Sequence, residues 1–174
     1  MRNGKTVVVV VVPNSRINEF TVYRKGSAMK LNQLSVFLEN KPGQLSESCL
    51  TLAKAGINIV TLSLADTQQF GILRLIVREP AKAKDVLEKA GWVVKLTEVV
   101  AIEVEDRPGG LAGVLEIIEG SGLNIEYMYA FTFRRGDRAV LVFRFDDPDV
   151  AVKVLQAKGV NVIGSVELYE RTAK

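Results

Sequence analysis

The chain has 174 residues, of which 48% are hydrophobic and 25% charged, a composition typical of folded globular proteins that excludes general disorder. One cysteine and no histidine mean no internal disulfide, and the commonest general base and zinc ligand are both missing. The net charge is +3, but residues 1–30 hold six basic side chains and one acidic side chain, so the remainder is slightly acidic. No nucleic-acid partner is expected, because the body of the protein offers no basic surface to a phosphate backbone.

The segment before residue 29 differs from the rest of the chain. It contains six consecutive valines at positions 7–12, far fewer than the ~20 apolar residues of a membrane-spanning helix. No small-x-small cleavage site follows closely, as a signal peptide would require. Two interpretations stay open: a β-prone extension, or non-native or upstream sequence with Met29 as the true start, which we favour. We assign this segment no function and expect a cytoplasmic protein with no membrane partner.

From residue 31 the predicted elements follow one another in a regular order. Residues 31–39 alternate apolar and polar side chains as a half-buried strand does. Leu45, Cys49 and Leu52 then have helical spacing, with a helix end predicted at Gly56. Two strands joined by a hairpin, a helix begun by proline and ended by glycine, and a closing strand are predicted in the ranges 57–65, 71–77, 80–91 and 92–96.

The same order of elements is predicted again from residue 99. A strand over 99–105 precedes a helix whose apolar residues are Leu111, Leu115 and Ile118, and this helix is predicted to end at Gly122. Two strands, a helix and a closing strand follow in the ranges 123–133, 139–145, 148–159 and 160–168. The turn between the two strands, "RRGD" at 134–137, favours a second hairpin.

The two halves are copies of one another. Pro42 matches Pro108 at an offset of 66 residues, and after a two-residue insertion Pro80 matches Pro148. The order in each copy is βαββαβ, which predicts an α+β fold of two tandem ferredoxin-like units, with antiparallel sheets and helices on one face. The predicted domains are 29–98 and 99–174. Almost no linker separates them, so we expect the units to pack together.

The most conspicuous repeated motif is a heptad, "ENKPGQL" at 39–45 and "EDRPGGL" at 105–111. In each copy it lies between the first strand and the first helix, where proline is predicted to begin the helix and glycine to allow a close approach. The helix start offers N–H groups and a positive dipole end to a carboxylate, and Asn40 or Asp106 can cap the same groups. A turn without a ligand explains the same residues and stays open.

These motifs, with "AKAGINI" and "EGSGLNI", resemble the ACT domain, a regulatory module of amino-acid metabolic enzymes such as phosphoglycerate dehydrogenase. The resemblance covers both units and is greatest to proteins made of two tandem ACT units without a catalytic domain. It implies an amino acid or similar small-molecule effector bound at the strand-to-helix loop, with an asparagine of a neighbouring unit completing the site. Carried over by position, the binding residues are Asn40, Lys41, Pro42, Gly43, Gln44, Leu45, Asn58, Asp106, Arg107, Pro108, Gly109, Gly110, Leu111 and Asn124.

The two loops are not expected to be equivalent. An asparagine amide can donate to a carboxylate or accept from an ammonium group, which lets Asn40 contact either end of an amino acid. Asp106 is ionised and cannot donate, so it favours an ammonium group. We therefore expect a different ligand pose or occupancy in the second loop. For Asn58 and Asn124, ordinary turn chemistry after a glycine is the alternative explanation.

Catalysis, a metal and a cofactor are not expected. Cys49 corresponds to an apolar position of the second copy and is interpreted as a small hydrophobic residue, and Asp146, Asp147 and Asp149 are interpreted as helix-start residues. An RNA-binding module of the same fold is a weaker alternative, because "GILRLIV" has no stacking aromatic residue and the two phenylalanines of "AVLVFRF" are expected to point into the core. A third interpretation is a regulatory subunit that docks on an enzyme such as acetolactate synthase. The expected partners are a second copy in a homodimer or a metabolic enzyme.

Overall fold

The computed structural model describes residues 29–66, 70–131 and 138–172. The predicted extension over 1–28 and both hairpin turns lie outside the described residues. The helices are α1 (Gln44–Lys54), α2 (Pro80–Lys89), α3 (Gly110–Glu119), α4 (Pro148–Ala157) and α5 (Ser165–Arg171). The strands are β1 (Leu31–Glu39), β2 (Ile59–Asp66), β3 (Phe70–Val77), β4 (Val93–Glu105), β5 (Ile125–Phe131), β6 (Arg138–Phe145) and β7 (Val162–Ile163).

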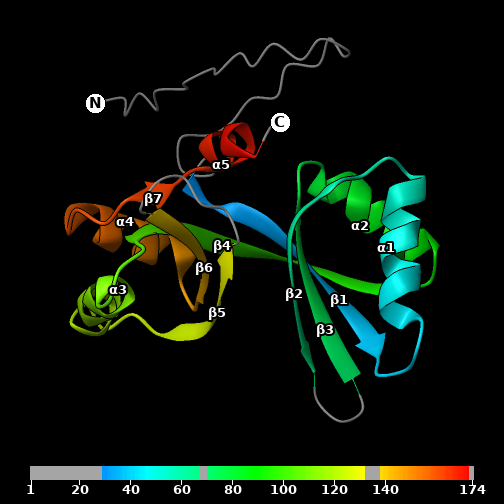
Figure 1. Ribbon diagram of the computed structural model, residues 1–174, viewed down its shortest axis with the longest axis horizontal. Coiled ribbons are helices and arrows are strands. Elements are labelled where there is room, and N and C mark those ends of the chain that lie inside the picture. Colours follow the sequence, from blue (N-terminus) through cyan, green and yellow to red (C-terminus); the bar gives the residue numbers. More distant parts are fainter. Residues whose placement is uncertain (1–28, 67–69, 132–137, 173–174) are drawn as a thin grey trace, which may run out of the picture.

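One antiparallel sheet runs through the whole molecule, in the order β2-β3-β1-β4-β6-β5, with β7 beside β4. Strand β4 belongs to both units, because Val93–Val99 pair with β1 and Val100–Glu105 pair with β6. Figure 1 shows β4 crossing from one unit to the other. The strand order β4-β1-β3-β2 in the first unit and β7-β4-β6-β5 in the second is that of a ferredoxin-like unit. The predicted fold is confirmed, and the two units are joined by a shared strand.

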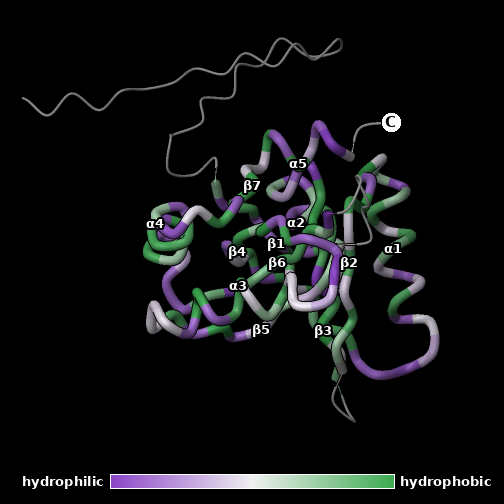
Figure 2. The backbone as a smooth tube through the Cα atoms, turned by 60° about the vertical axis from the view of Figure 1, so that its left-hand side comes forward, coloured by the Kyte–Doolittle hydropathy of each residue, from purple (hydrophilic) through white to green (hydrophobic). Residues whose placement is uncertain are grey.

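Each unit has its own core between its two helices and one face of its sheet. The apolar residues of β1 and β3 that face the helices pack with α1 and α2 in the first unit, and those of β4 and β6 pack with α3 and α4 in the second. In Figure 2 the helices carry hydrophobic and hydrophilic segments in turn, as amphipathic helices do. Helices on one face of each sheet are therefore confirmed.

A third core joins the units on the sheet faces opposite α1, α2, α3 and α4. It contains Leu31, Ile76, Val99 and Val142 among others, from β1, β3, β4 and β6. A buried polar network lies beside it: the Gln33 amide donates to Tyr127 Oη at 2.8 Å and accepts from Tyr129 Oη at 3.0 Å. Because Gln33 is in β1 and both tyrosines are in β5, this network connects strands at separate positions in the sheet and fixes the units relative to each other.

Helix ends follow the sequence prediction closely. Gly56, Gly91, Gly122 and Gly159 all have positive φ angles and lie just after α1, α2, α3 and α4. At the first of them, the N–H of Ile57 donates to the Leu52 carbonyl and the N–H of Gly56 to the Ala53 carbonyl, the pair of bonds of a Schellman motif. Glycine is required there because a side chain is strained at these φ values.

The buried face of α1 differs in part from the predicted one. Leu52 and Ser48 are buried, whereas Leu45 is 39% exposed and Cys49 is half-buried. Ser48 is accommodated because its hydroxyl donates to the Leu45 carbonyl at 2.9 Å. The buried face of α1 therefore includes Ser48, whose hydroxyl donates within the helix, beside Leu52.

The predicted closing strand of the second unit is wrong beyond Ile163. The chain forms the two-residue strand β7 and then helix α5, where an extended strand over 160–168 was expected. Ile163 pairs with Ala101, so two more residues of strand would bring the chain to Val99, a position already paired with Leu31 of β1. The chain leaves the sheet for this reason, and α5 packs across both units instead.

Helix α5 contacts both units. Leu168 lies in the core between the units, and the Tyr169 hydroxyl donates to the Val77 carbonyl of β3 at 2.9 Å. The Arg78 guanidinium in turn donates to the Tyr169 carbonyl. The helix therefore connects the end of β3 in the first unit to the second unit (Figure 1).

Candidate functional site

Both heptads form exposed loops that enter a helix through a left-handed glycine. Gly43 has φ +92° and Gly109 has φ +86°, and each is the N-cap residue of the helix that follows. A Cβ at either position would meet nothing within 4 Å, so these glycines are needed for backbone conformation and not for a close approach within the described residues. Pro42 and Pro108 precede the N-cap, so the prediction that they begin the helices is wrong.

The N-cap residue of both helices is a glycine, Gly43 or Gly109, which has no side chain to cap with. Capping of these helix starts by Asn40 or Asp106 stays a prediction. The N-terminal N–H groups of a helix have no acceptor within the helix itself, and the positive end of the dipole lies at the same place. Each loop therefore offers donors suited to an anion.

The other predicted residues of the loops are accessible. Asn40, Lys41, Pro42 and Gly43 are exposed in the first loop and Gln44 is half-buried. In the second loop Asp106, Arg107, Pro108 and Gly109 are exposed, and Gly110 and Leu111 are half-buried. Lys41 forms an ion pair with Glu39, and Arg107 with Glu105. Because each pair is exposed and local, its basic side chain can turn toward a ligand at little cost.

The two loops lie at opposite ends of β4. The first loop follows the end of β1 that pairs with Val93, and the second follows Glu105 itself. Asn58 and Asn124 precede β2 and β5, at the ends of those strands that pair with Val77 and Phe145. At ~3.3 Å per residue these asparagines are about 20 Å from either loop along the strands. A single chain does not bring the predicted asparagines to the loops.

The loops also differ in the hollows beside them. A pocket of about 340 Å³ adjoins the second loop, and one of about 90 Å³ adjoins the first. The smaller pocket, beside the first loop, is bounded by Asn40, Lys41, Gln44 and Leu45 together with Leu64 of β2. Only the larger volume falls in the range of small-molecule sites, ~300–1,000 Å³. The expected inequivalence of the loops therefore has a structural counterpart in the size of the adjoining hollow.

The backbone of the second loop is tighter. A Cβ on Gly110 would lie 2.0 Å from the Glu105 carbonyl oxygen, so a side chain is excluded there. Gln44 occupies the same position of the first heptad, where the chain accepts a long side chain. The two loops have different backbone paths although their sequences align without a gap.

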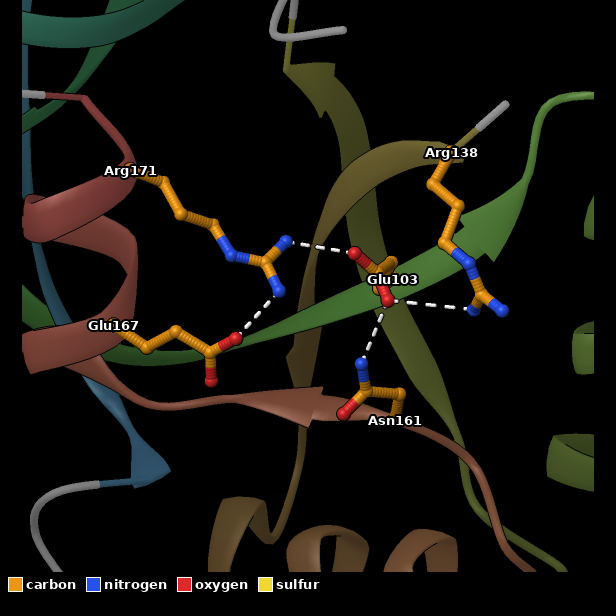
Figure 3. Close-up of polar contacts among 5 residues, drawn as sticks. All are labelled: Glu103, Arg138, Asn161, Glu167 and Arg171. Atoms are coloured by element: carbon orange, nitrogen blue, oxygen red, sulfur yellow. Dashed lines mark hydrogen bonds and ion pairs between the residues drawn. The ribbon is translucent and has the colours of Figure 1, made fainter. Parts of the chain in front are cut away.

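A cluster that sequence reasoning missed lies beside the second loop (Figure 3). Its centre is Glu103 of β4, which accepts hydrogen bonds from Arg171 at 2.7 Å, Asn161 at 2.7 Å and Arg138 at 3.3 Å. Arg171 also pairs with Glu167 within α5. The cluster connects β4, β6, the residue before β7 and α5.

The side chain of Glu103 is only 10% exposed. Its negative charge has little contact with water and is stabilised by the donors around it. Burial by itself acts to raise the pKa of this carboxyl, but the hydrogen bonds of Arg171 and Asn161 and the charges of Arg171 and Arg138 outweigh it, so the pKa lies below its usual value. The hydrogen bond to Glu103 likewise raises the pKa of Arg171. The sequence held one signal of this cluster, a glutamate at position 103 on the face of β4 that also carries Val99 and Ala101.

The part of the chain that the structure describes gives no basis for a metal centre, because no group of three or more His, Cys, Asp or Glu residues there could hold an ion. Asp147 caps α4 by accepting from the N–H groups of Asp149 and Val150, as predicted for a helix start. Among the described helices none is long and apolar enough to cross a membrane. Phe143 and Phe145 are fully buried and stack on each other in the core, so they cannot stack on RNA bases.

Comparison with known proteins agrees with this architecture. The crystal structure of protein BT0572 from Bacteroides thetaiotaomicron is 41% identical, with a TM-score of 0.76, covering 82% of this chain and 98% of that one. The ligand-free regulatory subunit of aspartate kinase from Thermus thermophilus is 16% identical, with a TM-score of 0.54 over 73% of this chain and 91% of that one. The regulatory subunit of aspartate kinase from Thermus flavus is 15% identical, with a TM-score of 0.53 over 82% of this chain and 94% of that one.

The two regulatory subunits share the fold of this chain. The comparison with curated proteins gives no match. A family profile described as an ACT domain pair matches residues 29–171, which is nearly the whole described part of the chain. The resemblance drawn from the heptads is confirmed: this chain belongs to the family of ACT domain pairs.

Proposed function

We propose that this ACT domain pair is a non-catalytic regulatory protein of the cytoplasm that binds an amino acid or a similar small molecule at its strand-to-helix loops. The observation that carries the proposal is the geometry of the loops. Each combines a left-handed glycine as the N-cap residue, the start of a helix and an exposed basic residue, Lys41 or Arg107. This combination complements a carboxylate.

A second copy of the chain completes each site. Asn58 and Asn124 are exposed and remote from the loops of their own chain, so they are available to a neighbouring molecule. The first loop also adjoins an apolar trio, Phe37, Phe70 and Val93, which are 42%, 55% and 67% exposed. Phe37 pairs with Val93 across β1 and β4, and Phe70 lies diagonally beside Phe37 on β3, so the three form one patch. A homodimer covers such a patch and brings foreign residues to the loop.

Regulation follows if the ligand prefers one arrangement of the dimer. A ligand shifts an equilibrium only by its difference in affinity for the two states. A site made of two chains provides such a difference, because only the correct arrangement places both halves of the site on the ligand.

A thermal-shift screen of amino acids at millimolar concentration tests the binding. A ligand at about 100 times its Kd adds about 2.7 kcal/mol, which raises Tm by roughly 5–10 °C at this chain length. Lys41→Met and Arg107→Met are expected to reduce the shift. Lys89→Met, which removes an exposed lysine 74% accessible at the end of α2, is the matched control and is expected to leave it unchanged. A screen in which no amino acid raises Tm contradicts the proposal.

Sedimentation velocity tests the dimer. Val93→Ser is expected to shift the population toward monomer, because it places a hydroxyl in the apolar trio. Val150→Ser changes a valine of α4 that is 43% exposed and serves as the control. A monomeric wild type at all concentrations contradicts the homodimer.

The same exposed trio supports a second candidate, docking on an amino-acid biosynthetic enzyme such as acetolactate synthase as its regulatory subunit. An apolar patch of this kind suits a protein partner of either sort. Purification from the native host distinguishes them: a co-purifying enzyme that is lost with Val93→Ser favours docking, and a pure homodimer opposes it.

A further inference from the structure

The larger pocket includes Arg107, Gly109 and Gly110 of the second predicted loop site, and residues of one chain line it. It lies between the second loop, the start of α3 and the residues that connect α4 to β7. Its lining holds three basic side chains, Arg107, Arg138 and Lys158, and two acidic ones, Glu103 and Glu105. The lining thus has more positive than negative charge, although the body of the chain is slightly acidic.

Two of the three basic side chains of the pocket already form ion pairs with acidic residues, and Lys158 does not within the described residues. Arg107 forms an ion pair with Glu105, and Arg138 forms one with Glu103. Lys158 lines the same pocket, and within residues 29–66, 70–131 and 138–172 its ammonium group makes no ion pair. An ammonium group at a pocket wall without a counter-charge suits a negatively charged group of a ligand.

The internal repeat shows that the pocket depends on small side chains. Val160 corresponds to Trp92 of the first unit, and Gly110 and Gly113 correspond to Gln44 and Glu47. Trp92 packs against the first core, as Val160 packs against the second. The second unit therefore has a valine and two glycines in the places where the first unit has a tryptophan, a glutamine and a glutamate.

The polar lining has changed in the same comparison. Arg138 and Asn161 correspond to Phe70 and Val93, both in the exposed apolar trio of the first unit, and Lys158 corresponds to Ala90. One unit thus has an apolar surface and bulky side chains where the other has charges around an open volume. The charged open pocket therefore distinguishes the second loop from the first.

We propose that this pocket binds a small dicarboxylate with an amino group, namely an acidic amino acid, with one ligand per chain. Lys158 pairs with one carboxylate, Arg107 or Arg138 with the other, and Glu105 accepts the ammonium group. The excess of basic side chains selects an acidic ligand over its neutral amide. The inference rests on the proposed function and names the ligand class of the pocket beside the second loop.

Isothermal titration calorimetry of the full chain with L-aspartate, L-glutamate, L-asparagine and L-glutamine tests this inference. One of the acidic ligands is expected to bind with a stoichiometry of one, and its neutral amide about tenfold or more weakly. Lys158→Met is expected to weaken binding about tenfold, the loss of one charged contact. Val160→Trp fills the pocket with the side chain of the first unit and is expected to abolish binding.

Two further variants keep the outcome decisive. Gly113→Glu introduces the residue of the first unit at an exposed position where a Cβ meets nothing within 4 Å, so it folds and is expected to block the pocket. Lys153→Met on α4, outside the pocket lining, is the control and is expected to bind like the wild type. Acidic and neutral ligands bound equally, or binding that survives both Val160→Trp and Gly113→Glu, overturns the inference while the proposed function stands. If no amino acid binds, in the calorimetry or in the thermal-shift screen, both this inference and the proposed function are refuted.

Discussion

Replacing Glu103 by glutamine tests how the second unit holds helix α5. The substitution keeps the shape of the side chain and removes its charge, so the three donors from Arg171, Asn161 and Arg138 lose an ionised acceptor. A hydrogen bond to a charged group contributes about 1.5–3 kcal/mol to the stability of the fold. Removing one partner of a buried ion pair strongly destabilises the folded protein, because the other charge is left without compensation.

The magnitude follows from the exposure of each partner. Glu103 and Arg171 are 10% and 14% exposed, whereas Arg138 is 51% exposed and its contribution is screened by solvent. The expected loss is therefore about 2–3 kcal/mol, and since each kcal/mol lowers Tm by about 2–4 °C at this length, Tm falls by roughly 5–10 °C. Urea unfolding followed by circular dichroism measures the loss in free energy of unfolding, and thermal unfolding measures the fall in Tm.

The control is Glu167→Gln, which removes an exposed carboxylate from the same arginine at i,i+4 spacing. Its expected effect is at most about 0.5 kcal/mol. A double-mutant cycle of Glu103→Gln with Arg171→Met is expected to give a coupling of about 1–3 kcal/mol. Equal losses for Glu103→Gln and Glu167→Gln refute the reasoning.

The difference in stability between the wild type and Glu103→Gln is expected to depend on pH. The folded-state pKa of Glu103 is lowered from 4.5, so its contribution to stability is complete above that pH and is lost as the pH falls through the folded value. The stability difference between the wild type and Glu103→Gln is therefore expected to be full near neutral pH and to shrink below 4.5. A difference that grows on acidification contradicts this assignment.

Four further substitutions test the local structure. Gly110→Ala is expected to destabilise the fold by several kcal/mol because its Cβ meets a backbone oxygen, whereas Gly113→Ala meets nothing and gains up to about 1 kcal/mol of helix propensity; thermal unfolding of the two compares them directly. Asp147→Ala removes both N-cap hydrogen bonds of α4 and is expected to cost about 1 kcal/mol in a urea titration, and an unchanged midpoint argues against the cap. Gln33→Leu leaves the half-buried Tyr129 hydroxyl without its acceptor and is expected to cost about 1–3 kcal/mol in a urea titration, and an unchanged unfolding midpoint contradicts the role of this network.

Much of the fold could be predicted because the sequence contains it twice. The glycines that end the helices, Gly56, Gly91, Gly122 and Gly159, need left-handed backbone wherever they stand, so their recurrence located each helix end. Pro80 and Pro148 were correctly placed at helix starts for a similar local reason, the fixed φ of proline.

Local rules failed where the structure depended on a distant strand. Residues 160–168 alternate like a strand, but Leu31 already occupies the position on β4 that a longer strand needs, and only the three-dimensional arrangement reveals this. The sequence predicts that the glycines of the heptads allow another group to approach closely. The structure shows that they are needed for their positive φ angles instead. The Glu103 cluster was missed because its members are far apart in sequence and come from four separate segments.

The central claim is that the strand-to-helix loops of this ACT domain pair bind an amino acid. Two-dimensional amide NMR of the labelled full chain, titrated with each amino acid to millimolar concentration, tests it most directly because it reports binding and position together. The account predicts saturable shifts concentrated at residues 40–45 and 106–111, with smaller changes near Asn58 and Asn124. Spectra unchanged by every amino acid, or saturable shifts confined to other parts of the molecule, would contradict it.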